Sequence, residues 1–268
     1  MTSTSRAPAV RLGLLAVLAV LAWISTVDRM QGMDAGPGTE LGGLGWFAGA
    51  WVVMTAAMMV PSILPKAVVD SRVRTGVFAS ALFLGGYLLT WTAAGLAGYA
   101  LFETLRALDI GFLAWGEGGR SVAAAVLLGA ALYELSPVKD ACLSACRRPL
   151  EPRRTGPVGA LRTGIAHGAW CVGSSWALMA ALFALGVMSV AWMALIAALI
   201  AAEKLLPWKA VATRGATAVL LALAIGVAVS PEDVPGLTLP SSSEAAPPMD
   251  GMGATAPFLV SAHHVVRL

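Results

Sequence analysis

Hydrophobic residues along this chain gather into long runs that are separated by short polar segments. A helix needs about 20 mainly apolar residues to cross the hydrocarbon core of a bilayer. Seven runs come close to that length: 10–27, 46–64, 76–102, 121–137, 158–185, 187–206 and 211–229. The pattern therefore predicts an all-α fold, a polytopic transmembrane bundle of about seven helices within residues 1–230.

The details of these runs refine the expected bundle. The fourth run is the shortest and carries Glu134, and only a tight turn around Gly186 separates the fifth run from the sixth, which predicts an antiparallel hairpin. Small residues in the third run should let neighbouring backbones approach closely; they are Gly85, Gly86, Gly95 and Gly98. Residues 231–268 are rich in Pro, Gly, Ala and Ser and are expected to form a disordered outer tail.

The distribution of basic residues predicts the orientation of the bundle. With the amino terminus inside, 14 of the 18 Lys and Arg residues fall in cytoplasmic segments or at the inner ends of runs. Such an excess is what the positive-inside rule expects of a cytoplasmic face. An odd number of crossings then places the carboxyl terminus outside, and we expect a multi-pass protein of the bacterial inner (plasma) membrane whose first partner is the lipid bilayer.

Composition agrees with this prediction and excludes several classes of protein. The chain is 58% hydrophobic and 12% charged, whereas soluble domains are about 25% charged. Its net charge of +3 comes from short loops rather than one basic face, so no nucleic-acid partner is expected. The first run is followed by no cleavage-site pattern and is read as a helix of the mature protein. The three cysteines predict no disulfide framework, and free or metal-bound thiols are the preferred interpretation.

Methionines in the second run are the first candidate for metal chemistry. Met54 and Met58 are four residues apart and share a helix face, Met59 follows about 100° round the helix, and Pro61 frees a backbone carbonyl. Thioethers are ligands for soft ions such as Cu(I). Because methionine also fills apolar cores, ordinary packing is the alternative.

The end of the fourth run and the loop after it supply a carboxylate and two thiols. Glu134 lies near the inner end of its run, where a charged group needs a partner or water. Cys142 and Cys146 are four residues apart, so both thiols project from one side if the loop begins as a helix. Incidental, buried thiols are the alternative interpretation of this CxxxC pair.

The fifth run contains the strongest single signal. His167 and Cys171 stand at i and i+4, and His167 is the only histidine within any of the seven runs. An imidazole and a thiol on one face of a helix form a plausible ligand pair for a soft or borderline metal. The alternative is a neutral histidine that is hydrogen-bonded to a carbonyl of an adjacent helix.

Further candidates lie in the sixth run and on the outer side. Met188 and Met193 are near the outer end of the sixth run, and Glu203 and Lys204 are at its inner end. Glu203 could bind an ion, but ordinary ion pairing with Lys204 or with a loop arginine is the preferred interpretation. Outside the runs there are two pairs of methionines: Met30 with Met33, and Met249 with Met252 near His263 and His264. Exposed methionine pairs suit Cu(I), and chance occurrence is the alternative.

The ordered series WVVMTAAMMVP, YELSPVKDACLSACRRPL, HGAWCVGSSWALM and GVMSVAWMALIAALIAAEKLLP resembles the bacterial DUF2182 family of predicted metal-binding integral membrane proteins. The resemblance covers about residues 46–207 and implies that these residues match the family pattern: Met54, Met58, Met59, Pro61, Glu134, Cys142, Cys146, His167, Cys171, Met188, Trp192, Met193, Glu203 and Lys204. The chain departs from it at Ser174 and Ser175, where family members often carry further cysteine.

These observations lead to a metal-handling hypothesis. The ion, most simply Cu(I) with zinc as the alternative, is expected to bind through Met54, Met58, His167 and Cys171 in the inner half of the bundle and to exchange with Cys142 and Cys146 at the cytoplasmic surface. A protein partner in a metal-handling or assembly complex is compatible with this hypothesis. A scaffold without metal and a transporter or channel remain as rivals, and the absence of a catalytic motif predicts no enzyme activity.

Overall fold

All regular structure in the described part of the chain is helical. The structure is a computed structural model that describes residues 6–30, 42–69, 77–107, 119–148, 156–187, 189–234 and 237. Eight α-helices and one 3-10 turn fall in these ranges, with no strand: α1 (Arg6–Met30), α2 (Leu44–Val69), α3 (Val77–Ala107), α4 (Arg120–Glu134), α5 (Pro137–Arg147), α6 (Pro157–Leu185), α7 (Val190–Leu205), α8 (Lys209–Val229) and η4 (Pro231–Asp233). The predicted all-α class is confirmed.

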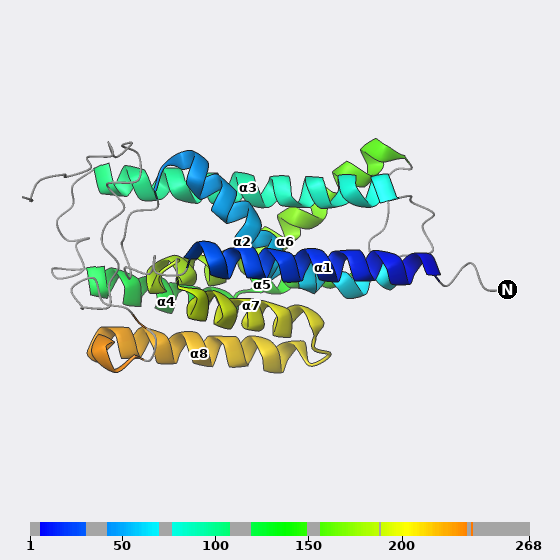
Figure 1. Ribbon diagram of the computed structural model, residues 1–268. Coiled ribbons are helices and arrows are strands. Elements are labelled where there is room, and N and C mark those ends of the chain that lie inside the picture. The colour runs from blue at the N-terminus through cyan, green and yellow to red at the C-terminus, as the bar shows by residue number, and fades with distance from the viewer. Residues whose placement is uncertain are drawn as a thin grey trace, which may run out of the picture.

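The helices form one bundle in which α2 and α6 cross the others obliquely (Figure 1). α3 packs along α6, α1 packs along α2, and α4 packs against both α8 and α6. α2 also contacts α3 and α7, and the short α5 lies against α6. Segments that are far apart in the sequence therefore meet around α6, which is the helix that carries the histidine and cysteine pair.

Glycines bring α3 and α6 into close contact. A Cβ on Gly86 would overlap the Leu161 carbonyl, and one on Gly164 would overlap the Phe83 carbonyl. The two backbones can approach this closely only because those side chains are missing. Of the four glycines predicted to serve this purpose on α3, Gly86 and Gly95 have neighbours that a side chain would strike, whereas the prediction is wrong for Gly85 and Gly98, which face open space.

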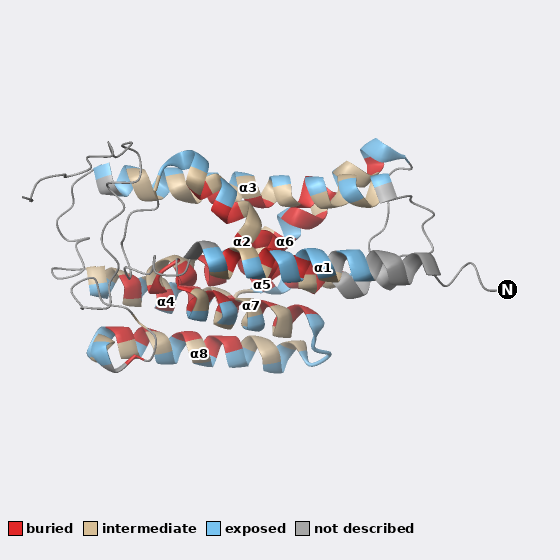
Figure 2. Ribbon diagram, viewed as in Figure 1, coloured by how far each residue is buried: buried red, intermediate tan, exposed pale blue. Residues whose placement is uncertain are grey.

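The burial pattern matches an apolar bundle with an apolar outer surface. Over their most apolar stretches α2 and α6 bury more than half of their residues, whereas α3 and α8 bury fewer than a third and leave the others partly or fully exposed (Figure 2). Many exposed positions are large hydrophobic side chains such as Phe78, Leu132 and Ile225. Among the described residues, four helices are long and apolar enough to cross a membrane, namely α2, α3, α6 and α8, and the bent pair α4 and α5 brings the number to five. α7 has 16 residues, short of a full span, so the count of seven stays a prediction.

The fourth predicted run is broken rather than continuous. α4 ends at Glu134, and α5 starts at Pro137 after a bend of 64°. Ser136 caps α5 because its side chain accepts a hydrogen bond from the Lys139 amide at 3.1 Å, and Pro137 fits the first helical position. The loop expected to carry Cys142 and Cys146 is therefore a helix from its start.

The predicted hairpin between the fifth and sixth runs is present. α6 ends at Leu185, the next residue is Gly186, whose φ of 115° favours glycine, and α7 starts at Val190. Several sequence predictions lie outside the described residues: the outer tail apart from its first few residues, Met33, Met188, Met249, Met252 and the two histidines near the carboxyl end.

Candidate metal site

The centre of the candidate site is the thiol of Cys171 on α6, which is 1% exposed. The Tyr87 hydroxyl of α3 lies 2.9 Å from its sulfur, and the Lys204 ammonium of α7 donates a hydrogen bond to it at 2.8 Å. The Cys146 thiol of α5 lies close enough to the same sulfur to act on it electrostatically. Four helices thus meet at one sulfur, and two thiols from different helices lie together there.

Met59 adds a thioether to this group. The Lys204 Nζ that contacts Cys171 also lies 3.9 Å from the Met59 Sδ, and Met59 is completely buried on α2. The resulting sulfur cluster consists of Cys146, Cys171 and Met59 with the Lys204 ammonium among them. A cation that touches both a thiol and a thioether marks a position where a soft monovalent ion would find the ligands it prefers.

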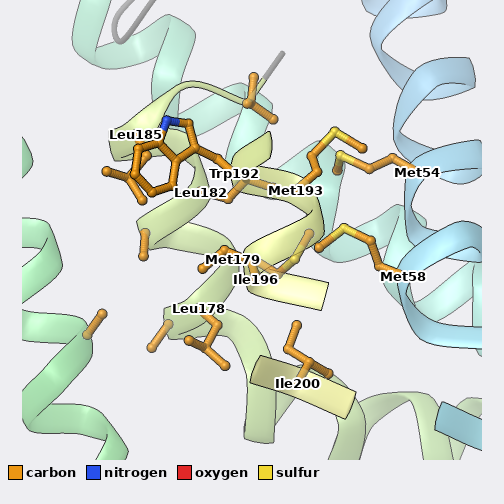
Figure 3. Close-up of a cluster of buried hydrophobic side chains, with 14 of the residues drawn as sticks. Met54, Met58, Leu178, Met179, Leu182, Leu185, Trp192, Met193, Ile196 and Ile200 are labelled. Carbon is orange, nitrogen blue, oxygen red and sulfur yellow. The ribbon is translucent and has the colours of Figure 1, made fainter. Parts of the chain in front are cut away.

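The other two methionines of α2 face a different part of the core. Met54 and Met58 extend from α2 toward Met193 of α7 and Met179 of α6 (Figure 3). All four side chains are at most 3% exposed and belong to the large buried core that also includes Met59, Cys146 and Cys171. The three methionines of α2 therefore have different neighbours. Met59 belongs to the sulfur cluster, and Met54 and Met58 belong to a group of thioethers.

His167 is buried beside this region rather than exposed to the surroundings. Its imidazole lies beside two rings of α3, with centroids 6.1 Å from Phe83 and 6.0 Å from Tyr87. Tyr87 thus contacts His167 with its ring and Cys171 with its hydroxyl. The role of His167 as a metal ligand stays a prediction.

Cys142 lies one turn before Cys146 on α5 and also faces α6. A Cβ added to Gly173 would come within 2.8 Å of the Cys142 Sγ, so the thiol occupies space that this glycine leaves free. The Tyr133 hydroxyl donates to the Gly173 carbonyl at 2.6 Å, which fixes α4 to the same point of α6. Cys142 thus packs at Gly173, and Cys146 is the thiol that reaches Cys171.

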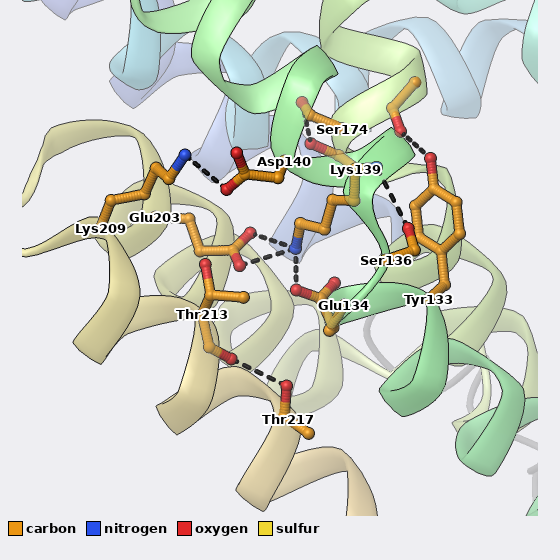
Figure 4. Close-up of polar contacts among 12 residues, drawn as sticks. Tyr133, Glu134, Ser136, Lys139, Asp140, Ser174, Glu203, Lys209, Thr213 and Thr217 are labelled. Atoms are coloured by element: carbon orange, nitrogen blue, oxygen red, sulfur yellow. Dashed lines mark hydrogen bonds and ion pairs between the residues drawn. The ribbon is translucent and has the colours of Figure 1, made fainter.

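The two predicted carboxylates share one buried ammonium (Figure 4). Lys139 donates to Glu203 at 2.6 and 2.7 Å and also to Glu134, and all three side chains are at most 2% exposed. Glu203 is ion-paired, as expected, but its partner is Lys139 rather than Lys204 or a loop arginine, and the Lys204 ammonium contacts Cys171 instead. Arg147 does approach Glu203, but its guanidinium donates to the backbone carbonyl at 2.5 Å.

Sequence reasoning missed three residues of this region: Tyr87, Lys139 and Met179. A buried carboxylate at position 134 needs a cation, and Lys139 lies five residues later, so that partner could have been found. A tyrosine or a methionine in an apolar run carries no such signal, because both are ordinary core residues.

A metal site with three or more side-chain ligands among the described residues would have to draw on methionine as well as His, Cys, Asp and Glu. No group of three or more His, Cys, Asp and Glu side chains within the described ranges is arranged to bind an ion. The thiols of Cys146 and Cys171 are one ligand short of such a group, and Met59 supplies a third soft atom beside them. Three sulfurs would suit copper better than a hard cation.

Comparison with known proteins identifies the family. The chain matches the family model described as PpoB2 copper chaperone over residues 48–227. It belongs to this family. The match replaces the DUF2182 label suggested by the sequence, while the expectation of copper handling agrees with it. The matched range contains every member of the sulfur cluster and of the Lys139 ion cluster, and neither a curated protein nor a solved structure matches the chain.

Proposed function

We propose that this protein binds Cu(I) through the sulfurs of Cys146, Cys171 and Met59 and passes it to a partner protein, as an integral membrane member of the copper chaperone family. The observation that carries the proposal is the meeting of two thiols from α5 and α6 at a buried point beside a thioether of α2. Thiolate and thioether ligands together select Cu(I) over hard ions such as Mg²⁺. Zinc, which also accepts thiolate, is the rival cargo.

Lys204 supports this assignment by the position of its charge. Its ammonium carries one positive charge and sits against Cys171 and Met59, in contact with the sulfurs that would bind the ion. Cu(I) also carries one positive charge, so it can take the place of the ammonium beside the Cys171 sulfur, and each thiol that binds the ion gives up its proton. Burying an additional charge would otherwise cost free energy.

The ion cluster offers the displaced ammonium a place to go. Glu134 and Glu203 carry two negative charges, and Lys139 is the ammonium that they share. The Oε1 atom of Glu134 is buried and has no hydrogen-bond partner among the described residues. Since Glu203 directly precedes Lys204, the displaced side chain remains beside an excess of negative charge.

The proposal includes a membrane location. The apolar outer faces of α3 and α8 suit contact with lipid, and we propose seven crossings of the inner membrane with the amino terminus inside. In that orientation α5 and the inner ends of α6 and α7 lie near the cytoplasm. Copper would enter and leave the sulfur cluster from that side, and no catalytic step is part of the proposal.

Copper content of detergent-purified protein tests the function. Wild-type protein is loaded with Cu(I) under reducing, oxygen-free conditions, and bound copper is measured for it and for the variants C171S, C146S and C142S. C171S and C146S should each lose the tightly bound ion, while C142S should keep it, because Cys142 packs against Gly173 and not against Cys171. Equal copper in all four proteins would contradict the proposal and favour the scaffold alternative, and preferential retention of zinc would identify the rival cargo.

A further inference from the structure

Four buried methionines near Met58 take no part in the proposed thiol site, and they are called the thioether group here. It consists of Met54 and Met58 of α2, Met179 of α6 and Met193 of α7. Their exposed fractions lie between 0 and 3%, and the four side chains extend from three helices toward one another (Figure 3). Single methionines are common core residues, but four from three helices bring four soft atoms into one region.

We propose that these four methionines form a second Cu(I) site, which exchanges the ion with the thiol site through α2. Neutral thioethers are ligands for Cu(I) and have little affinity for hard cations. The surroundings favour the same selection, because the neighbouring side chains are apolar residues such as Leu178, Leu182 and Ile196. A hard cation would have to give up its water there without gaining oxygen ligands.

The charge balance predicts that the second site is the weaker one. The thioethers are neutral, so a bound Cu(I) keeps its full positive charge in apolar surroundings, which costs free energy. At the thiol site the sulfurs bind as thiolates and the charge is compensated. A weaker site suits brief occupancy during handover more than storage.

The order of residues along α2 connects the two sites. Met58 and Met59 are consecutive, and a helix turns about 100° per residue, so neighbouring side chains of one helix serve adjoining regions of the core. Met59 lies at Lys204 and Cys171, and Met58 lies among the thioethers. An ion leaving the thiol site can therefore move to a new sulfur without crossing a helix.

The proposal rests on the proposed function for the identity of the ion, and binding curves separate the two. Full-length protein in detergent is titrated with Cu(I) against a chromophoric chelator. Wild type should show two classes of site with one ion each, the second at least tenfold weaker, and the double variant C146S/C171S should retain the weaker class alone. A single class in wild type that disappears in C146S/C171S would overturn the second site and leave the thiol site standing. No binding by wild type would instead refute the proposed function.

Two adjacent substitutions provide matched controls. M58L should abolish the weaker class and leave the tighter one, while M59L should weaken the tighter class and leave the weaker one. Leucine has a similar volume and is usually tolerated at a buried methionine. Loss of the same class in both variants would overturn the assignment of Met58 and Met59 to different sites.

A measurement that leaves all four methionines in place keeps the proposal testable if M58L or M59L folds poorly. C146S/C171S protein labelled with selenomethionine is loaded with one equivalent of Cu(I), and X-ray absorption at the copper edge is recorded. Selenium neighbours around copper are the expected result. A first shell of nitrogen and oxygen alone would overturn the proposal.

Discussion

Lys139 provides the sharpest test of the buried electrostatics beside the sulfur cluster. The variant K139M keeps most of the side-chain volume but removes the ammonium that Glu134 and Glu203 share. Both carboxylates then remain buried without a cation. Breaking a buried ion pair by removing one partner costs about 3–5 kcal/mol, which is a large part of a typical stability of about 5–15 kcal/mol. We therefore expect K139M to lower the free energy of unfolding by about 3–5 kcal/mol.

The same substitution at Lys209 is a matched control. Lys209 pairs with Asp140 of α5 at 2.5 Å, but the side chains of Lys209 and Asp140 are 30% and 63% exposed. A solvent-exposed pair contributes about 0–1 kcal/mol. The stability of K209M should therefore be close to that of wild type, although this variant also removes a lysine charge from an ion pair that involves α5.

Unfolding by sodium dodecyl sulfate from dodecylmaltoside micelles, followed by far-ultraviolet circular dichroism, measures both variants. A third protein, K139M/E134Q/E203Q, removes all three charges and should recover roughly half of the lost stability or more, because a neutral replacement no longer buries unpaired carboxylates. Equal stability of K139M and K209M would refute the reasoning. Failure of the triple variant to recover any stability would show that the cost comes from packing rather than charge.

Two further variants test the contacts of α3. Y87F removes the hydroxyl that contacts Cys171; it should cost about 1 kcal/mol of stability and leave one tightly bound copper, as measured by unfolding and metal analysis. G164A places a methyl group against the Phe83 carbonyl and should destabilise the protein by about 1–3 kcal/mol, whereas G85A, at a position with open space, should be neutral or slightly stabilising; equal unfolding midpoints for the two alanine variants would contradict the close packing of α3 and α6.

Much of the fold could be predicted from the sequence because long apolar runs have few alternatives to a helix. Each of the seven runs corresponds to a helix, and the turn at Gly186 lies where its sequence indicates. The break at residues 135–136 was not predicted, although Ser136 and Pro137 form a recognisable helix start. The predicted fourth run extends through Ser136 and Pro137 because only the length of the apolar stretch was used to define it.

The site was predicted in its residue types more than in its contacts. Soft side chains at positions 54, 58, 59, 146 and 171 were identified from the chemistry of thioethers and thiols. Which of them meet depends on the rotation of each helix about its axis, and a helix that is apolar on all sides gives no signal for that rotation. The pairing of Lys204 with Cys171, and of Lys139 with both carboxylates, required coordinates for the same reason.

X-ray absorption at the copper edge of wild-type protein carrying one equivalent of Cu(I) tests the central claim most directly. If copper is bound by Cys146, Cys171 and Met59, its first coordination shell should contain sulfur alone. Labelling with selenomethionine should then replace one of these sulfurs by selenium. The M59L variant should lose the selenium neighbour and keep the sulfurs. A shell dominated by nitrogen or oxygen, or a spectrum unchanged in C146S/C171S protein, would contradict the account.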